Sequence, residues 1–553
     1  MLYLVLFVFC FLLLIIFVNY KKRREFIRIN RTIQDKWSKP EIADRDFNLI
    51  SSYYYKVAND HILSDSTAED IDFEKLFAYV DRTNSKIGQQ YLYCKLKSQE
   101  NNLSSLKVLD TLVEQFKDTD LRQALEYELS KLNKVNAYFL HELFTVNIQN
   151  LYNNVLGWYI KFAGFLWLFS LGFMILEKSE AGFVVTFILT IVNLYLHFRN
   201  KQKIARYVHT LPQLNLLLQV AKRISDKIST PEALLVKKNI SLLGKLKVYL
   251  SFVSFEDSVS KDPSDIASGI WELFKTFLLI EPAMFIISID RVSKHKNTIK
   301  MVFNYVAHLD FAVSIQSLRQ DLPMYSKPEF ILDENTIMIE ALYHPLVKNC
   351  VQNSIVVSAS QGVLITGSNM SGKTTFIRSI AINTLLSQTL FTSCTKAYKG
   401  PFLSLSTSIR VSDDIESQKS FFQAEATSVL TIIKKSMKES GSLIIIDEIF
   451  KGTNTIERVA AAKAILSYLA FNKKFIFVST HDLELAELLG DEYAMYSFEE
   501  TVCEQRLVFD YKLKEGVLRN KNGIAILSSL GYPEIIVSEA RLISDQLRKK
   551  YNM

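Results

Sequence analysis

The stretch GVLITGSNMSGKTTFIRSIAIN, residues 362–383, decides how the C-terminal part of this chain should fold. Its first residues are apolar and predict a buried strand, and the residues after Gly372 predict a helix. Between them, GSNMSGKT (residues 367–374) matches the pattern G-x-x-x-x-G-K-[ST]. A strand, a glycine-containing loop and a helix in this order predict an α/β domain that binds the phosphates of a nucleotide.

The residues of this loop have distinct expected roles. Gly367 and Gly372 let the backbone curl so that its N–H groups face the phosphates, and the N-terminus of the following helix adds a favourable dipole. Lys373 is expected to reach the β- and γ-phosphates of ATP, and Thr374 to bind Mg²⁺. The nucleotide-binding candidates are Gly367, Ser368, Asn369, Met370, Ser371, Gly372, Lys373, Thr374 and Thr375.

Two further strands end in polar residues that fit the same chemistry. SLIIIDEIFKGTNT (residues 442–455) places Asp447 at the end of an apolar strand to hold Mg²⁺, directly or through water, and Glu448 beside it to polarise the attacking water. FIFVSTHDLELAEL (residues 475–488) ends its strand near His481, which could sense the γ-phosphate. An acid pair that only caps a helix, and a histidine that only occupies a turn, remain the alternatives.

The rest of the chain changes in residue composition and periodicity along its length. Residues 72–150 and 201–332 are rich in Leu, Lys, Glu and Gln at helical spacing, which predicts an all-α region. After about residue 336, short β-branched strands alternate with amphipathic helices, as in an α/β domain with a largely parallel sheet. The expected fold is therefore multi-domain, with an all-α core and lever region and a C-terminal α/β P-loop ATPase domain of the ABC-like kind.

Apolar segments predict three transmembrane helices. Residues 1–18 carry no charge, and YKKRREFIRINR (residues 20–31) follows them, so the N-terminus should lie outside the cell and the rest inside. Residues 162–198 form two apolar runs around a short polar turn, with basic residues at both ends, which predicts a hairpin. A multi-pass protein of the cell membrane with a cytoplasmic ATPase is expected, and a buried hairpin in a soluble protein is the alternative.

Composition narrows the possible partners. The 553 residues carry a net charge of +7, which permits contact with nucleic acid or anionic lipid without requiring either. The five cysteines have no C-x-x-C spacing, so we expect reduced thiols and no metal cluster.

Several motifs together resemble the MutS family of mismatch-repair ATPases. TGSNMSGKTT (residues 366–375) looks like the Walker A segment of that family, with its Asn-Met pair, and DEIFKGTNT (residues 447–455) is similar to its Walker B segment. STHDLEL (residues 479–485) is similar to its histidine-containing switch. The resemblance implies ATP and Mg²⁺ as ligands and ATP hydrolysis as the reaction.

Two more stretches carry implications about a partner subunit. IRVSDDIESQKSFFQAEATSV (residues 409–429) resembles the motif of the family in which a serine, here Ser420, completes the nucleotide site of the other subunit. Residues 511–540 are similar to its C-terminal helix-turn-helix, which is used for dimer contact. A homodimer is therefore expected.

The resemblance also suggests how the chain is divided. Residues 76–96 and 308–318 look like the start and the end of the helical core and lever domain of the family. A mismatch-reading domain is not expected, because only a short basic linker separates the first apolar segment from the core. The expected parts are an anchor (1–18), a linker (19–71), helical core (72–150), a transmembrane hairpin (151–198), core and levers (199–335), the ATPase domain (336–520) and a dimerisation segment (521–553).

These observations predict a membrane-anchored MutS-like ATPase that couples ATP binding and hydrolysis to the movement of helical levers. DNA is a possible client. One alternative is an ATP-gated DNA tether at the membrane, and another is an ABC-like motor that acts on a membrane or protein client. The lack of an LSGGQ-type signature and the small number of predicted spans count against a transporter.

Overall fold

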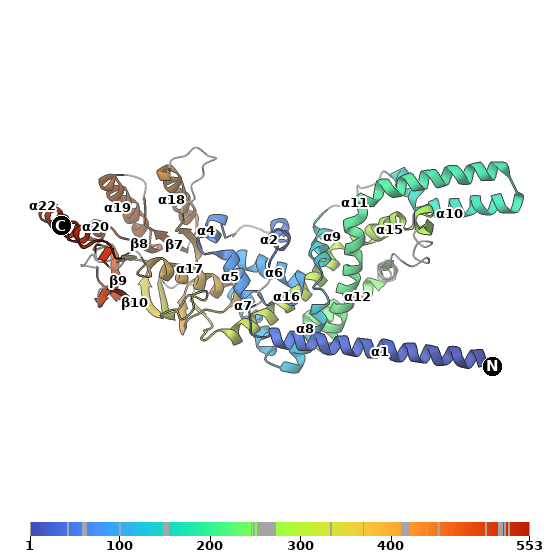
Figure 1. Cartoon of the computed structure of the whole chain (residues 1–553), viewed down its shortest axis with the longest axis horizontal. Helices are drawn as coiled ribbons and strands as arrows, with labels where there is room; N and C mark the ends of the chain where they lie inside the picture. Colours follow the sequence, from blue (N-terminus) through green and yellow to red (C-terminus); the bar gives the residue numbers. More distant parts are fainter. Residues whose placement is uncertain are drawn as a thin grey trace. The chain divides into compact units, whose positions relative to one another are not determined.

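A computed structural model of the whole chain shows its fold (Figure 1). It describes residues 2–40, 44–57, 63–98, 101–146, 154–244, 246, 249–250, 273–331, 335–368, 370–410, 421–439, 441–450, 454–503, 506–517, 524, 527–528 and 531–551. The chain divides into two compact units. The first comprises Met1–Ala58, Asp81–Cys94 and Leu112–Ser317, and the second comprises Asn59–Val80, Lys95–Thr111 and Leu318–Met553.

The described secondary structure of the first unit consists of helices. Its helices, two of which continue into the second unit, are α1 (Leu2–Lys36), α2 (Phe47–Ser51), α3 (Tyr54–Val57), α6 (Lys86–Lys97), α8 (Thr119–Ser130), the 3-10 helix η1 (Val135–His141), α9 (Glu142–Thr145), α10 (Asn154–Glu177), α11 (Glu180–Lys227), α12 (Pro231–Leu242), α15 (Ile280–Lys294) and α16 (Lys296–Asp321). Asp310 of α16 is fully buried, and its carboxylate accepts hydrogen bonds from the N–H groups of Asn84 and Ser85 at 2.9 and 2.8 Å. Gly88 lies so close that an added Cβ would be 2.1 Å from this carboxylate.

Helices α10 and α11 run side by side as a hairpin (Figure 1). Side-chain hydrogen bonds join them, from Tyr159 to Asn193, from Trp167 to Thr190 and between Ser170 and Thr186, at 2.7–2.8 Å. Their large apolar side chains are mostly exposed, among them Phe165, Phe169, Leu176, Phe183, Phe187 and Tyr195. In the described part of the chain, Val155–Glu177 and Glu180–Lys201 are long and apolar enough to cross a membrane, as judged by length and composition.

Helix α11 continues far beyond the hairpin. It contains 48 residues, with Pro212 among them, which corresponds to a length of about 72 Å along the helix axis at 1.5 Å per residue. Leu211, Leu214 and Leu217 in its second half are buried in the first unit. One helix thus joins the apolar hairpin to the core of this unit.

Helix α1 differs from the expected anchor and linker. It is one continuous helix to Lys36, so it passes through the boundary expected at residue 18. Most side chains of residues 1–18 lie outside the described part of the structure. The expected first transmembrane span therefore stays a prediction.

The second unit is built around two sheets. The larger has the strand order β10-β9-β4-β8-β7-β6, in which only the β10–β9 pair is antiparallel. Its strands are β4 (Gly362–Gly367), β6 (Ser404–Ser408), β7 (Ser442–Asp447), β8 (Phe475–Thr480), β9 (Tyr493–Cys503) and β10 (Arg506–Glu515). The smaller sheet has the order β1-β5-β2-β3, with β1 (Glu329–Phe330), β2 (Thr336–Leu342), β3 (Asn353–Ser358) and β5 (Ala397–Gly400).

Helices cover the larger sheet. α17 (Lys373–Leu390) is buried along most of its length and contacts β4, β6, β7 and β8. A second apolar cluster joins the sheet to α18 (Phe421–Lys438), α19 (Thr455–Phe471) and α20 (Leu483–Leu488). The remaining helices are α4 (Asp65–Asp70), α5 (Phe73–Val80), α7 (Leu103–Gln115), which ends in the first unit, and α22 (Glu534–Tyr551).

The predicted fold class is confirmed in its main division, a helical N-terminal region followed by a C-terminal α/β region with a largely parallel sheet. The expected domain boundaries stay predictions. One grouping was not expected: α4 lies in the expected linker and α5 at the start of the expected helical core, but both belong to the same compact unit as the α/β region, where α4 contacts β6.

Candidate active site

The predicted phosphate loop lies between β4 and α17 and depends on two glycines. Gly372 caps α17 with a φ of 107°, a left-handed conformation that favours glycine. Gly367 has a φ of 154°, and an added Cβ there would lie 2.8 Å from the carbonyl oxygen of Phe498. Neither position accepts a side chain without a shift of the backbone, so the loop keeps its tight curl.

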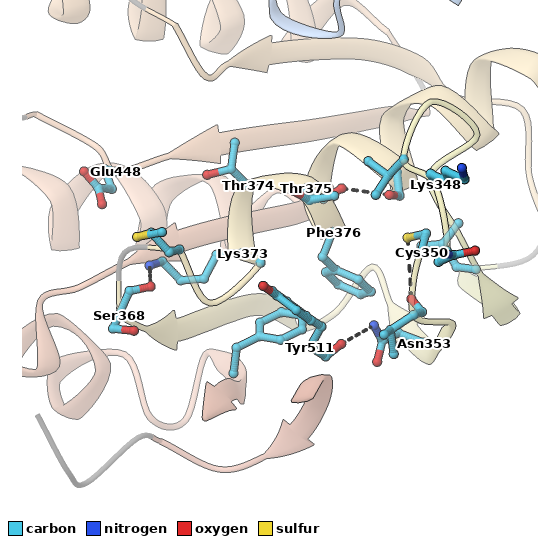
Figure 2. A pocket seen from close by; sticks show the side chains of 18 residues that line it. Lys348, Cys350, Asn353, Ser368, Lys373, Thr374, Thr375, Phe376, Glu448 and Tyr511 are labelled. Carbon is cyan, nitrogen blue, oxygen red and sulfur yellow. Dashed lines mark hydrogen bonds between the residues drawn. The ribbon is translucent and has the colours of Figure 1, made fainter. Parts of the chain in front are cut away.

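Lys373 lies inside this curl. Its side chain is buried, and its Nζ donates hydrogen bonds to the carbonyl oxygens of Gly367 and Ser368 at 2.7 and 2.8 Å (Figure 2). The ammonium group is therefore held against the loop whose N–H groups are expected to face phosphate. On the other side of the loop, the Ser368 hydroxyl donates to the carboxylate of Glu500 on β9, a contact that sequence reasoning missed.

Thr374 and Asp447 meet at the end of the sheet. The Thr374 hydroxyl donates to Oδ2 of Asp447 at 2.6 Å, and the Ser479 hydroxyl donates to the other carboxylate oxygen. Asp447 and Ser479 are register partners on the parallel strands β7 and β8, which brings both side chains to one edge. A hydroxyl and a carboxylate oxygen are ligands that Mg²⁺ prefers, so the donor set fits this ion.

Glu448 and His481 form a pair next to this position. The backbone N–H of Glu448 donates to the carbonyl oxygen of Ser479 at 2.9 Å, and its φ of 57° is unusual for a residue with a side chain. Nδ1 of His481 lies 3.2 Å from Oε1 of Glu448. This hydrogen bond raises the pKa of His481, partly opposed by burial.

A pocket of about 690 Å³ opens beside the loop. It is lined at one end by Lys373, Thr374 and Glu448 and at the other by the residues around Cys350, and Tyr511 lies between the two ends, close to Gly372 (Figure 2). The backbone oxygen of Tyr511 accepts a hydrogen bond from Asn353, also in the pocket wall, at 3.0 Å. This volume lies in the usual range for small-molecule sites. Sequence reasoning missed this far wall, because its residues follow no motif.

The structure brings five of the predicted site residues together and leaves others apart or undescribed. Lys373, Thr374, Asp447, Glu448 and His481 lie around one edge of the sheet. Of the other loop candidates, Met370 is exposed and Ser371 is buried. Thr375 lines the pocket. Asn369 and Ser420 lie outside the described residues. The catalytic and binding roles of all these residues stay predictions.

Comparison with known proteins places this site in a wider context. Residues 363–548 match the family model described as MutS domain V. DNA mismatch repair protein MutS of Clostridium tetani (strain Massachusetts / E88) is 28% identical over 330 residues, which cover 57% of this chain and 37% of that protein.

Two further proteins of the same name are similar. The one from Petrotoga mobilis (strain DSM 10674 / SJ95) is 30% identical over 271 residues, 47% of this chain and 33% of that protein. The one from Staphylococcus haemolyticus (strain JCSC1435) is 29% identical over 285 residues, 49% of this chain and 32% of that protein. The chain spans about a third of the length of these curated relatives. Its C-terminal region is an ATPase domain similar to MutS domain V, in a chain distantly related to the MutS proteins.

Proposed function

We propose that this chain is a Mg²⁺-dependent ATPase that works as a dimer at a membrane and couples ATP turnover to movement of its helical unit. The observation that carries the ATPase part of the proposal is the convergence of Lys373, Thr374, Asp447 and Glu448 at one edge of the sheet. These residues come from two separate motifs, and their side-chain types fit phosphate, metal and water in turn.

Each side chain has a defined part in hydrolysis. Lys373 binds the β- and γ-phosphates, and the N–H groups of the loop donate hydrogen bonds to the phosphate oxygens. Thr374 and Asp447 would hold Mg²⁺, which neutralises charge on the phosphates when bound. Glu448 orients the attacking water and accepts its proton, and His481 fixes the Glu448 carboxylate through their 3.2 Å contact. The base and ribose occupy the part of the 690 Å³ pocket that leads from Tyr511 to the residues around Cys350.

A variant pair tests this site. Asp447→Asn should weaken metal-dependent ATP binding, and Glu448→Gln should preserve binding and slow hydrolysis. ATPase assays and fluorescent-nucleotide binding on the full chain measure the two effects separately. Hydrolysis at the wild-type rate by both variants would remove the basis of the proposal.

Dimerisation completes the site in this proposal. Ser420 of one chain contacts the γ-phosphate bound by the other, as the resemblance to MutS implies. Mixed dimers of Lys373→Ala and Ser420→Ala chains then contain one intact site and recover part of the activity that neither homodimer shows. If mixing restores nothing while both variants still dimerise, the composite site is wrong.

The hairpin of α10 and α11 is the proposed membrane segment. Its polar side chains pair with each other between the helices, while its large apolar side chains are exposed, the arrangement expected of helices in lipid. We place Ser179, at its turn, outside the cell and the ATPase domain inside. A membrane-impermeant thiol reagent should then label Ser179→Cys on intact cells and miss Lys438→Cys, an exposed position on α18. The opposite labelling pattern overturns this topology.

DNA is the client to test first, because the three similar proteins are named DNA mismatch repair proteins. Helix α11 runs from the hairpin into the core of the first unit and is the proposed lever, and Pro212 inside it is a position where it can bend. ATPase rates of the detergent-purified chain should be compared without DNA and with duplex, mismatched and branched DNA at several salt concentrations. Stimulation that falls steeply with salt supports a DNA client, since phosphate contacts release counterions. No stimulation leaves a membrane or protein client.

A further inference from the structure

Asp72 lies between α4 and α5, far from the ATPase motifs in sequence, but it binds two of their arginines. Its Oδ2 accepts hydrogen bonds from Nη2 of Arg410 at 3.0 Å and from Nη1 of Arg378 at 3.3 Å. Its Oδ1 accepts a third from Lys75 at 3.2 Å. Burial alone would raise the pKa of Asp72, but Lys75 and the two arginines outweigh it and hold the pKa below its usual value. The carboxylate is therefore charged at neutral pH.

The position of Asp72 is fixed by its neighbour Asp70. The buried Asp70 carboxylate accepts hydrogen bonds from the Thr407 hydroxyl at 2.6 Å and from the backbone N–H groups of Ile409 and Arg410 at 3.0 and 2.7 Å. These bonds attach the segment around α4 to the end of β6. Asp72 is thereby held at a constant place beside the ATPase site.

Arg378 connects Asp72 to the predicted metal site. It lies on α17 four residues after Thr374, on the same face of the helix, and Thr374 contacts Asp447. The pKa of Arg378 is lowered by burial and by Arg410, while the negative charges of Asp72, Asp70 and Asp447 oppose that shift. Among the described residues, the buried Nε of Arg378 has no hydrogen-bond partner. The guanidinium thus keeps an unused donor within the field of a second carboxylate.

We infer that Asp72 is a positioning residue of the ATPase site, which holds Arg378 in an ion pair and so prevents it from pairing with Asp447. A carboxylate paired with arginine binds a divalent cation less well, because the two cations compete for the same oxygens. Asp72 therefore keeps Asp447 available for Mg²⁺. The inference rests on the proposed role of Asp447 as a metal ligand.

The test measures metal binding directly as well as activity. Mn²⁺ replaces Mg²⁺, and electron paramagnetic resonance follows free Mn²⁺ in the presence of the full chain and a non-hydrolysable ATP analogue. Asp72→Asn should raise the Mn²⁺ dissociation constant about tenfold, the effect of one freed unit charge near a partly screened carboxylate. The Mg²⁺ concentration for half-maximal ATPase activity should rise in parallel, while the KM for ATP at saturating Mg²⁺ stays within twofold.

Two variants separate this effect from a general loss of structure. The double variant Asp72→Asn with Arg378→Gln should return to wild-type Mn²⁺ affinity, because the competing cation is gone. Lys75→Ala is the matched control: Lys75 also pairs with Asp72, but it is exposed, so Mn²⁺ affinity should not change. Wild-type affinity in Asp72→Asn, or no recovery in the double variant, overturns the inference.

Arg378→Gln alone decides the matter if Asp72→Asn does not fold. Its Mn²⁺ affinity should equal or exceed that of the wild type, and weaker binding overturns the inference. Asp447→Asn isolates the premise. If it binds Mn²⁺ as the wild type does, the proposed metal site fails and the inference fails with it. If it loses Mn²⁺ while Asp72→Asn binds normally, the inference alone is overturned.

Discussion

Substitution of Asp70 by asparagine should loosen the start of the segment that leads to Ser420. Asp70 is 2% exposed, and its Oδ1 accepts from Arg410 N–H while its Oδ2 accepts from the Thr407 hydroxyl and Ile409 N–H. Asparagine keeps one oxygen acceptor and places an NH₂ group at the other position. The Thr407 hydroxyl can rotate to accept from that NH₂ group, but the Ile409 N–H then faces another donor.

The magnitude follows from these contacts. One buried backbone donor left without an acceptor costs about 1–3 kcal/mol, and weakening of the charge-assisted bond to Arg410 N–H adds about 1 kcal/mol. Burial raises the pKa of Asp70 despite its hydrogen bonds, so ionisation already costs part of their benefit in the wild type. We therefore expect the lower half of this range, about 2 kcal/mol, which is a melting shift of about 4–8 °C for a domain of 150–250 residues.

Hydrogen exchange with mass spectrometry gives the local readout. Peptides that contain Ile409 and Arg410 should exchange faster in Asp70→Asn, by roughly tenfold or more for about 2 kcal/mol. Peptides from the helical unit should be unchanged, and Glu69→Gln, at an exposed position of the same helix, serves as the control. Unchanged exchange at residues 409–410 together with a melting temperature within 1 °C of wild type, a difference of roughly a few tenths of a kcal/mol, would refute the reasoning.

Three other predictions concern single charged side chains. Glu448→Gln should bind ATP normally and hydrolyse it at least about 100-fold more slowly, whereas Lys373→Ala should weaken ATP binding itself; normal turnover by Glu448→Gln would mean that another group positions the water. In NMR titrations His481 should have a pKa above its ordinary value, and the pKa should return toward that value in Glu448→Gln, since the pair with Glu448 favours the imidazolium. The contribution of this pair to folding stability is fully present below the unfolded pKa of histidine and is lost as pH rises through the raised folded pKa. Identical titration in both proteins contradicts that pairing. Burial raises the pKa of Glu126 to about 8, so its ionisation costs folding stability progressively as pH rises above its unfolded pKa. Glu126→Gln should therefore have a higher melting temperature than the wild type at high pH. The difference in melting temperature, measured by differential scanning fluorimetry, should narrow toward acid pH. A gap independent of pH would show that Glu126 is not the cause.

The sequence predicted the centre of the site better than its surroundings. Lys373, Asp447 and His481 each follow a short apolar strand, and parallel strands bring their carboxyl ends to one edge of a sheet. Motif residues that follow or end parallel strands are therefore expected to lie close to one another. The alternation of short β-branched strands with amphipathic helices predicted the α/β region and its mainly parallel sheet.

The contacts that surround this centre have no such signal. Asp70 and Asp72 lie in a short helix and a turn, and their partners Arg378 and Arg410 are more than 300 residues away in the chain. Local periodicity cannot report a pairing of that kind, and neither can it show that Tyr511 lines the pocket. The continuation of α1 to Lys36 also escaped prediction, because a change from apolar to charged residues marks a change of environment and not the end of a helix.

The three-part composition of the second unit bears on how its ATPase can be isolated. A truncated polypeptide that begins at Leu318 retains the phosphate loop but lacks Asn59–Val80 and Lys95–Thr111. It exposes the surface on which α4 packs and leaves the amides of Ile409 and Arg410 without Asp70. A protease that cuts once between the units leaves the earlier pieces attached by non-covalent contacts. The ATPase domain therefore cannot be transferred as one continuous segment. A fusion protein that is meant to keep its geometry must also include Asn59–Val80 and Lys95–Thr111.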